Sequence, residues 1–212
     1  MLQRRVGWIL TAGMSLLMGL PAAADPVDNP GPFTLTLPSG YFLIGNNQRR
    51  FDVDPTNPPM LGGSVDGTGA VALPQSEINF PDATITVPGL GNITVRILAR
   101  SDGTGSLDAF RGDAIASVSL DVNLIHSFLP VGCGIRPIDL TVTTGTSGTL
   151  TGVPYDQALG TATYVSNDSV VPGSSNCGLL GGLIDAQIGL PAAAGVNKTE
   201  LNAQFSPIFT GS

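Results

Sequence analysis

Four aspartates have the side chains and the local setting to bind a calcium ion. Asp52 and Asp54 flank Val53 and so lie on one face of an extended segment, while Asp66 and Asp102 each begin an Asp-Gly-Thr-Gly sequence. Carboxylate and backbone carbonyl oxygens are the ligands that Ca²⁺ takes in proteins. Asp-Gly sequences also form tight turns when no ion is present. Because no EF-hand loop or Gly-Asp-rich repeat occurs, these four residues are calcium candidates and the sequence predicts no complete metal motif.

His126 is the single histidine, and Ser127 follows it. One histidine suffices for a nucleophilic triad if the fold supplies an acid and a serine. No Gly-x-Ser-x-Gly elbow is present, and an imidazole at a strand end more often makes an ordinary hydrogen bond. Two of the 16 acidic residues could instead act on a glycoside. The sequence therefore assigns no catalytic residue and no cofactor, and favours a protein that is not an enzyme.

Two cysteines, Cys133 and Cys177, lie 44 positions apart in the chain. Redox pairs favour a Cys-x-x-Cys spacing, and a single histidine cannot complete a Cys/His zinc set. An even number of cysteines in an exported chain is typical of structural disulfides. We predict that the two residues pair, which in the chain-entropy model stabilises the fold by about 4 kcal/mol.

The first 24 residues have the pattern of a signal peptide. Arg4 and Arg5 precede an apolar run over 6–20, and three alanines at 22–24 supply the small residues that signal peptidase recognises. The run is shorter than the ~20 residues that a membrane-spanning helix needs. We predict that 1–24 are removed from a bacterial protein that is secreted or held at the cell surface, with no transmembrane segment in the mature chain.

Removal of this segment changes the composition of the working protein. Trp8, the only tryptophan, leaves together with Arg4 and Arg5, so that seven basic residues face 16 acidic ones, a net charge of −9. Phosphates would meet net repulsion, which excludes nucleic acid as a partner class. The scarcity of flat aromatic side chains also disfavours glycosidases and carbohydrate-binding modules.

Alternation of apolar and polar residues predicts antiparallel strands. The clearest segment is 114–124, where small and aliphatic side chains face one way and polar ones such as Ser119 and Asp121 face the other. Pro38–Gly40 is expected to end the first strand, and the Pro88–Asn92 cluster is expected to join a hairpin. The further predicted strands are 33–37, 41–44, 83–87, 93–97, 138–142, 161–165 and 201–205.

Helical spacing of apolar residues occurs only over 178–189, and glycines weaken it. Short strands at regular spacing with no long helices predict an all-β fold, an antiparallel β-sandwich or flattened barrel with at most one short helix near 178–189. The polar, Pro-containing segment 25–32 is expected to be a mobile leader. Residues 33–212 are expected to form a single β-domain.

The C-terminal half carries a set of turn and disulfide residues: Val131–Gly134, Gly152–Asp156, Gly160–Val165, Val171-Pro172, Cys177-Gly178 and Gly189–Asn197. Together they resemble uncharacterised secreted β-rich proteins of actinobacteria, over roughly residues 60–212. The resemblance implies export and a β-sandwich-like fold in which two half-motifs flank a disulfide. It implies no active site, so no functional residue is transferred.

These observations favour a secreted or cell-envelope β-domain with a non-enzymatic binding or structural role. Its candidate partners are cell-wall material, another protein or an apolar ligand. Two alternatives stay open. A carrier of a lipid or small apolar ligand requires an enclosed apolar cavity. A secreted hydrolase requires that His126 or two carboxylates lie in a cleft.

Overall fold

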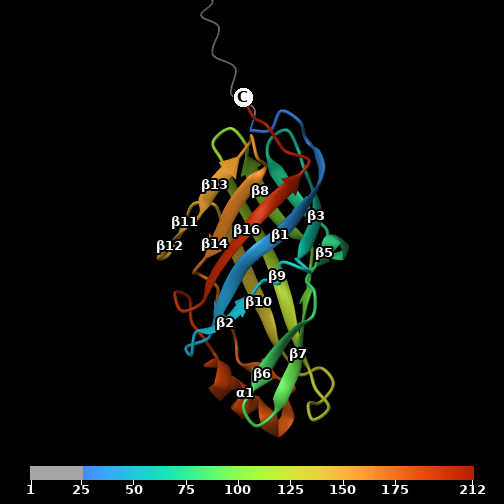
Figure 1. The fold of residues 1–212 in the computed structure, drawn as a ribbon, viewed down its shortest axis with the longest axis vertical. Coiled ribbons are helices and arrows are strands. Elements are labelled where there is room, and N and C mark those ends of the chain that lie inside the picture. Colours follow the sequence, from blue (N-terminus) through green and yellow to red (C-terminus); the bar gives the residue numbers. More distant parts are fainter. Residues whose placement is uncertain (1–25) are drawn as a thin grey trace, which may run out of the picture.

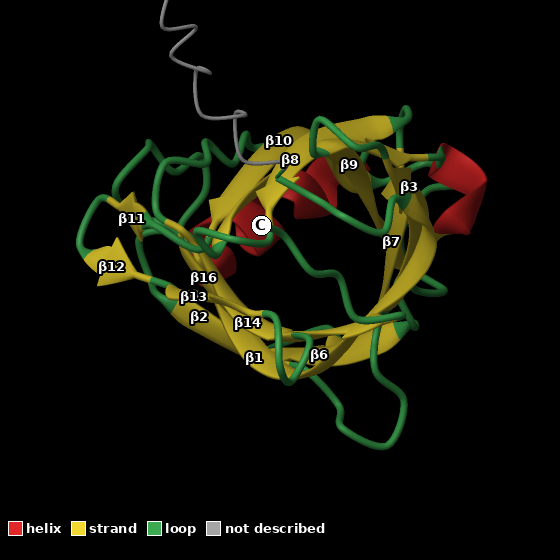
Figure 2. Cartoon of the chain, turned by 90° about the horizontal axis from the view of Figure 1, so that it is seen from above, coloured by secondary structure: helices red, strands yellow, loops and turns green. Residues whose placement is uncertain are grey.

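The computed structural model describes residues 26–212, so the predicted signal peptide at 1–24 lies outside the described residues. Antiparallel strands dominate these residues, which confirms the predicted all-β fold (Figure 1). Eight of the strands close into a barrel, seen end-on in Figure 2, and the others extend the sheet beyond it. One α-helix, α1 (Gly181–Ile188), lies within the region predicted for it.

The barrel strands, in hydrogen-bonded order, are β10 (Gly134–Thr143), β14 (Thr161–Ser166), β16 (Lys198–Ser206), β1 (Gly31–Ile44), β3 (Met60–Val65), β4 (Ala70–Leu73), β8 (Gly103–Asp108) and β9 (Asp113–Ile125), and β9 pairs with β10 to close the ring. Outside the ring, β2 (Arg49–Asp52) pairs with β1, β5 (Ile78–Asn79) with β3, β13 (Val153–Asp156) with β14, and β15 (Ser174–Ser175) with β10. A hairpin of β6 (Ala83–Val87) and β7 (Gly91–Ala99) pairs with β9, and β11 (Thr146–Ser147) and β12 (Leu150–Thr151) form a separate small sheet. Two single-turn 3₁₀ helices span Gln75–Glu77 and Gly178–Leu180.

The two strands predicted over 33–37 and 41–44 are one continuous strand, because β1 does not end at Pro38–Gly40. The strand continues through these residues with a shift of register against β16 between Thr36 and Ser39. Gly40 has a φ of 145°, and a side chain at this position would collide with the backbone of Glu200. A β-bulge at Leu37-Pro38 therefore replaces the predicted turn, and Gly40 beyond it permits the close approach of β16.

The sequence predicts a mobile leader over 25–32, and the described part of this segment, residues 26–32, contacts the rest of the domain. Val27 is buried, and Asp28 N–H donates to the carbonyl of Thr210. The side-chain amide of Asn29 donates to the carbonyl of Ile208 and its oxygen accepts Thr210 N–H. The polar, Pro-containing composition of this segment did not reveal these contacts, because they come from the distant C-terminus.

The two ends of the domain contain separate cores. At the closed end, where the ring of eight strands is complete, aromatic rings pack together: the centroids of Phe33 and Phe205 are 5.5 Å apart, and those of Tyr155 and Phe205 are 5.2 Å apart. Phe209 is fully buried among them. These rings lie beside the N-terminal half of β1, so apolar residues of both chain ends fill the barrel.

The opposite end, which we call the open end, has an aliphatic core around Ile93, Ile135 and Val171. Helix α1 buries Ile184 and Ile188 against it, and Gly189 ends the helix in the left-handed conformation that glycine adopts readily. The predicted disulfide between Cys133 and Cys177 is confirmed and lies in this core. Among residues 26–212, no helix is long and apolar enough to cross a membrane.

Candidate functional site

A cleft of about 320 Å³ separates two strands at the open end. Its walls are β2 and β6, and its floor includes Gln187 and Ile188 of α1. Because β2 pairs only with β1 and β6 only with β7, each strand has one edge without a neighbour in the part of the chain that the structure describes. We call the space between these edges the edge slot, comprising Arg49–Asp52, Ala83–Val87, Gln187 and Ile188.

The slot arises because two long strands each change partner along their length. Residues 31–36 of β1 pair with β3, whereas residues 41–44 pair with β2 on the same edge. Likewise, residues 113–117 of β9 pair with β8, and residues 120–125 pair with β7. At the closed end the wall is therefore continuous from β1 through β3, β4 and β8 to β9. At the open end the corresponding wall consists of β2 and the β6–β7 hairpin, which do not pair.

The turns beside each strand show which backbone groups point into the slot. The carbonyl of Val87 accepts Leu90 N–H within the β6–β7 hairpin, so Val87 directs its polar groups toward β7. Successive residues of a strand direct their backbone N–H and C=O groups to opposite edges. Thr84 and Thr86 therefore direct these groups to the outer edge of β6, away from β7. Val53 N–H donates to the carbonyl of Gly40 in β1. By the same alternation, Arg50 and Asp52 of β2 direct their backbone N–H and C=O groups into the slot.

The two edges differ in chemistry. β2 carries two arginines and an aspartate, and charged side chains discourage strand pairing at an edge. β6 has the sequence Ala-Thr-Ile-Thr-Val, uncharged and rich in β-branched residues that favour strands. Pro81 and Pro88 flank β6 and limit any pairing to its five residues. β6 is therefore the edge better suited to accept another strand.

Arg49 supplies a positive charge to the slot. Its Nε donates to the carbonyl of Gln187 at 3.0 Å, and its Nη2 lies 3.3 Å from Oε1 of the same residue. Over residues 26–212, no carboxylate lies within 4.0 Å of its guanidinium. The neighbouring Arg50 is instead paired with Asp52 at 2.8 Å and lies over the ring of Tyr41.

The floor of the slot is fixed by the turn between β1 and β2. Asn46 donates its side-chain amide to the carbonyl of Gly189, and Asn47 donates to the carbonyl of Ala186. These bonds satisfy carbonyls at the C-terminal end of α1, where a helix leaves its last acceptors without intrahelical partners. Arg49 adds a cation at the same helix end, which the helix dipole favours.

The four calcium candidates lie in separate local settings. Asp54 and Asp66 accept hydrogen bonds from Thr56 and Thr68, and these side-chain bonds lower the pKa of both carboxyl groups. Asp52 pairs with Arg50, and Asp102 accepts the backbone N–H of Gln75. Within residues 26–212, no group of three or more His, Cys, Asp or Glu side chains is placed to hold a metal. The structure therefore does not bring the four together, and calcium binding at any one of them stays a prediction.

His126 lies just after β9. Its Nδ1 accepts the backbone N–H of Phe128 at 3.2 Å, and the two rings are 5.2 Å apart. None of the described carboxylates comes within 4.0 Å of the imidazole. The structure thus places no orienting acid beside His126 and does not assemble a triad around it.

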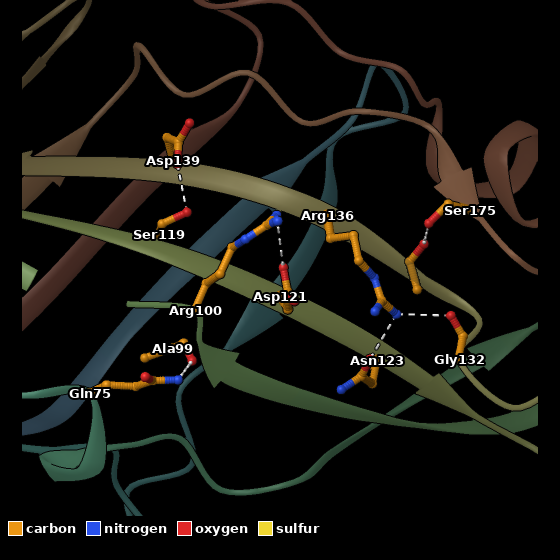
Figure 3. Close-up of polar contacts among 11 residues, drawn as sticks. Gln75, Ala99, Arg100, Ser119, Asp121, Asn123, Gly132, Arg136, Asp139 and Ser175 are labelled. Carbon is orange, nitrogen blue, oxygen red and sulfur yellow. Dashed lines mark hydrogen bonds and ion pairs between the residues drawn. The ribbon is translucent and has the colours of Figure 1, made fainter. Parts of the chain in front are cut away.

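A row of polar side chains covers the outer face of β9 and its neighbours, as the alternation over 114–124 predicts (Figure 3). Arg136 donates to Asn123 at 2.9 Å, and Ser119 donates to Asp139 at 2.7 Å. Arg100 lies 3.7 Å from Asp121. Asp139 of this row also lines a smaller pocket, of about 160 Å³, together with Ser147 and Asp168.

Comparison of the chain with protein-family models, with curated proteins and with solved structures finds no match. The site must therefore be interpreted from its own geometry.

Proposed function

We propose that the protein is a secreted binding domain that captures an extended segment of a partner protein by β-strand addition to β6. The observation that carries the proposal is the edge slot, in which two unpaired strand edges face one another across a cleft of about 320 Å³. Main-chain hydrogen bonds would supply affinity, and alternate side chains of the added strand would supply specificity. The disulfide is compatible with an extracellular location.

The chemistry of the slot restricts the segment it would accept. β6 offers five residues, which correspond to about 17 Å of an added strand. Phe51, Ile85, Val87 and Ile188 favour apolar side chains at alternate positions facing the floor. Arg49 favours a carboxylate at one end of the segment, because its charge lacks an acidic partner among the described residues. The proposed partner is therefore an extended segment with alternating aliphatic residues and an acidic end.

The proposal is tested with two capped heptapeptides, Glu-Val-Thr-Val-Thr-Val-Glu and its counterpart with lysine in place of both glutamates. We expect the acidic peptide to protect the amides of Thr84 and Thr86 from hydrogen exchange, and the basic peptide to bind at least about tenfold more weakly. Perturbation of residues remote from the slot, or equal binding of both peptides, would count against the proposal.

Thr86→Pro and Thr86→Val form a matched pair of variants. Proline removes the outward N–H without removing a β6–β7 bond, whereas valine keeps that N–H and, like proline, lacks the hydroxyl that bonds Asn92. We expect Thr86→Pro to abolish peptide binding while changing the free energy of unfolding by no more than about 1 kcal/mol. Thr86→Val should still bind. If the protein instead dimerises through β6, sedimentation will show association that Thr86→Pro removes, and the heterologous partner is then excluded.

A further inference from the structure

The two walls of the edge slot run in opposite directions. β2 begins at Arg49, which bonds to α1, and ends at Asp52, away from the helix. β6 begins at Ala83 and ends at Val87, which belongs to the same aliphatic core as the buried residues of α1. Figure 1 shows the turn of the β6–β7 hairpin beside the helix. The slot therefore has a helix end, at Arg49 and Val87, and a far end, at Asp52 and Ala83.

A strand placed between two antiparallel walls can be antiparallel to only one of them. All strand pairings among residues 26–212 are antiparallel, and antiparallel pairs are slightly more stable per residue than parallel ones. β6 is the wall better suited to accept a strand, because it is uncharged and rich in β-branched residues. A bound segment is therefore expected to run antiparallel to β6, with its amino-terminal end at the helix end of the slot.

An antiparallel segment would use all the outward backbone groups of β6. Thr84 and Thr86 would each exchange two hydrogen bonds with a single residue of the segment. The segment residues opposite Ile85 and Val87 would then face the floor of the slot, because side chains directly opposite one another lie on the same face of a sheet. The alternation of β6 therefore sets the register of the segment as well as its direction.

The two ends of the slot differ in charge. At the helix end, Nε and Nη2 of Arg49 bond to Gln187, while its Nη1 makes no hydrogen bond within residues 26–212 and is available to a carboxylate. At the far end, each carboxylate already has an arginine: Asp52 lies 2.8 Å from Arg50, and Asp82, just before β6, lies 2.6 Å from Arg96. An acidic side chain thus gains a cation at the helix end and meets only carboxylates in ion pairs at the far end.

From the strand directions and these charges, we propose that the edge slot distinguishes the direction of the segment it binds. The segment lies antiparallel to β6, and an acidic residue at its amino-terminal end contacts Arg49. This inference rests on the proposed function and adds which end of the segment is acidic. The partner class becomes extended segments in which an acidic residue precedes the alternating aliphatic residues.

Two capped heptapeptides of identical composition test the proposal, Glu-Val-Thr-Val-Thr-Val-Thr and Thr-Val-Thr-Val-Thr-Val-Glu. We expect the peptide with glutamate first to bind about three- to fivefold more tightly at low ionic strength, and the preference to shrink as NaCl is added. Equal affinities, or tighter binding of the peptide with glutamate last, would overturn this inference alone. If neither peptide binds, the proposed function fails and the inference fails with it.

The direction of the bound peptide can also be measured without reference to affinity. A nitroxide on the amino-terminal cap of the peptide with glutamate first should broaden the amide resonance of Val87 more than that of Ala83, because these residues lie at opposite ends of β6. Stronger broadening at Ala83 would show a parallel segment and would contradict the proposal.

Arg49→Gln separates charge recognition from support of the slot floor. Glutamine removes the cation, so the two peptides should bind this variant with equal affinity. Arg100→Gln removes an arginine that lies 3.7 Å from Asp121, outside the slot, and should keep the full preference as the matched control. If Arg49→Gln weakens both peptides by the same factor, the preference persists, and Arg49 then supports the slot without selecting the acidic end.

Discussion

The closed and open ends of this domain bury apolar side chains in different ways. At the closed end, eight strands form a complete ring around a cluster of aromatic side chains, and no strand of that ring is left with a free edge there. At the open end, the wall is interrupted between β2 and β6, and a disulfide and a short helix hold an aliphatic core together. Closure of a sheet removes the edges of its strands, whereas β2 and β6 at the open end each keep one edge with backbone groups available for a partner.

If the closed end carries most of the stability, removing one of its rings should have the largest effect of any single substitution. Phe205 is buried and contacts the rings of Phe33, Tyr155 and Phe209. We expect Phe205→Ala to lower the free energy of unfolding by about 3–5 kcal/mol in urea titrations. Phe128→Ala, at a position 73% exposed, should change it by less than about 0.5 kcal/mol. Similar losses for both would remove the distinction between the ends.

The disulfide should matter chiefly for the open end. Replacing Cys133 and Cys177 by alanine opens a loop of 44 residues, which the chain-entropy model values at about 4 kcal/mol. We expect amide hydrogen exchange to accelerate most in α1 and β15, which lie near the bridge, and least in β16. Uniform acceleration across the domain would instead mean that the two cores unfold as one unit.

A single hydroxyl at the closed end fastens the C-terminal segment to the barrel. The Tyr155 hydroxyl accepts the backbone N–H of Phe209 at 2.7 Å and donates to its carbonyl at 3.1 Å. Tyr155→Phe leaves both buried groups without this partner, and we expect a loss of about 1–3 kcal/mol in the free energy of unfolding. A neutral effect, measured by the same urea titration, would show that Phe209 is held by packing alone.

The smallest expected effect concerns the β6 edge itself. Arg96 of β7 donates two hydrogen bonds to Asp82, just before β6, and these lower the pKa of the Asp82 carboxyl below its ordinary value of 3.8. Because this pKa is lower in the folded state than in the unfolded state, the ionised carboxylate stabilises the fold. This stabilisation is fully present above the unfolded-state pKa and is lost as the pH falls through the folded-state pKa. We expect protection of the β6 amides, corrected for intrinsic exchange, to fall by less than about fivefold on acidification below pH ~4. Asp82→Asn should abolish this dependence, and its persistence would assign it to another group.

Much of the fold follows from local patterns. The two-residue period predicted the β6–β7 hairpin and strands β9, β10, β14 and β16, because along most of each strand more buried residues alternate with more exposed ones. The cysteines could be paired since there were only two of them. The continuation of β1 through Pro38–Gly40 was missed, because a bulge depends on the strands that flank it rather than on the segment itself.

Neither candidate site could be predicted from local patterns. The edge slot exists because β1 and β9 change partners midway, a property of the whole sheet that no segment encodes. In the smaller pocket, Asp139 lies within a predicted strand, and Asp168 follows another, 29 positions later, so no motif spacing joins them. The one available signal was the alternation in 138–142, which places Asp139 on the polar face of its strand.

The central claim, that β6 has an open outer edge, is tested most directly by residue-resolved amide hydrogen exchange of the unliganded protein. Thr84 and Thr86 direct their N–H groups into the slot, whereas Ile85 directs its own toward β7. We predict that the amides of Thr84 and Thr86 exchange at least about 100-fold faster than that of Ile85. Equal protection at all three positions would contradict the account, because it would mean that β6 is already paired on both edges.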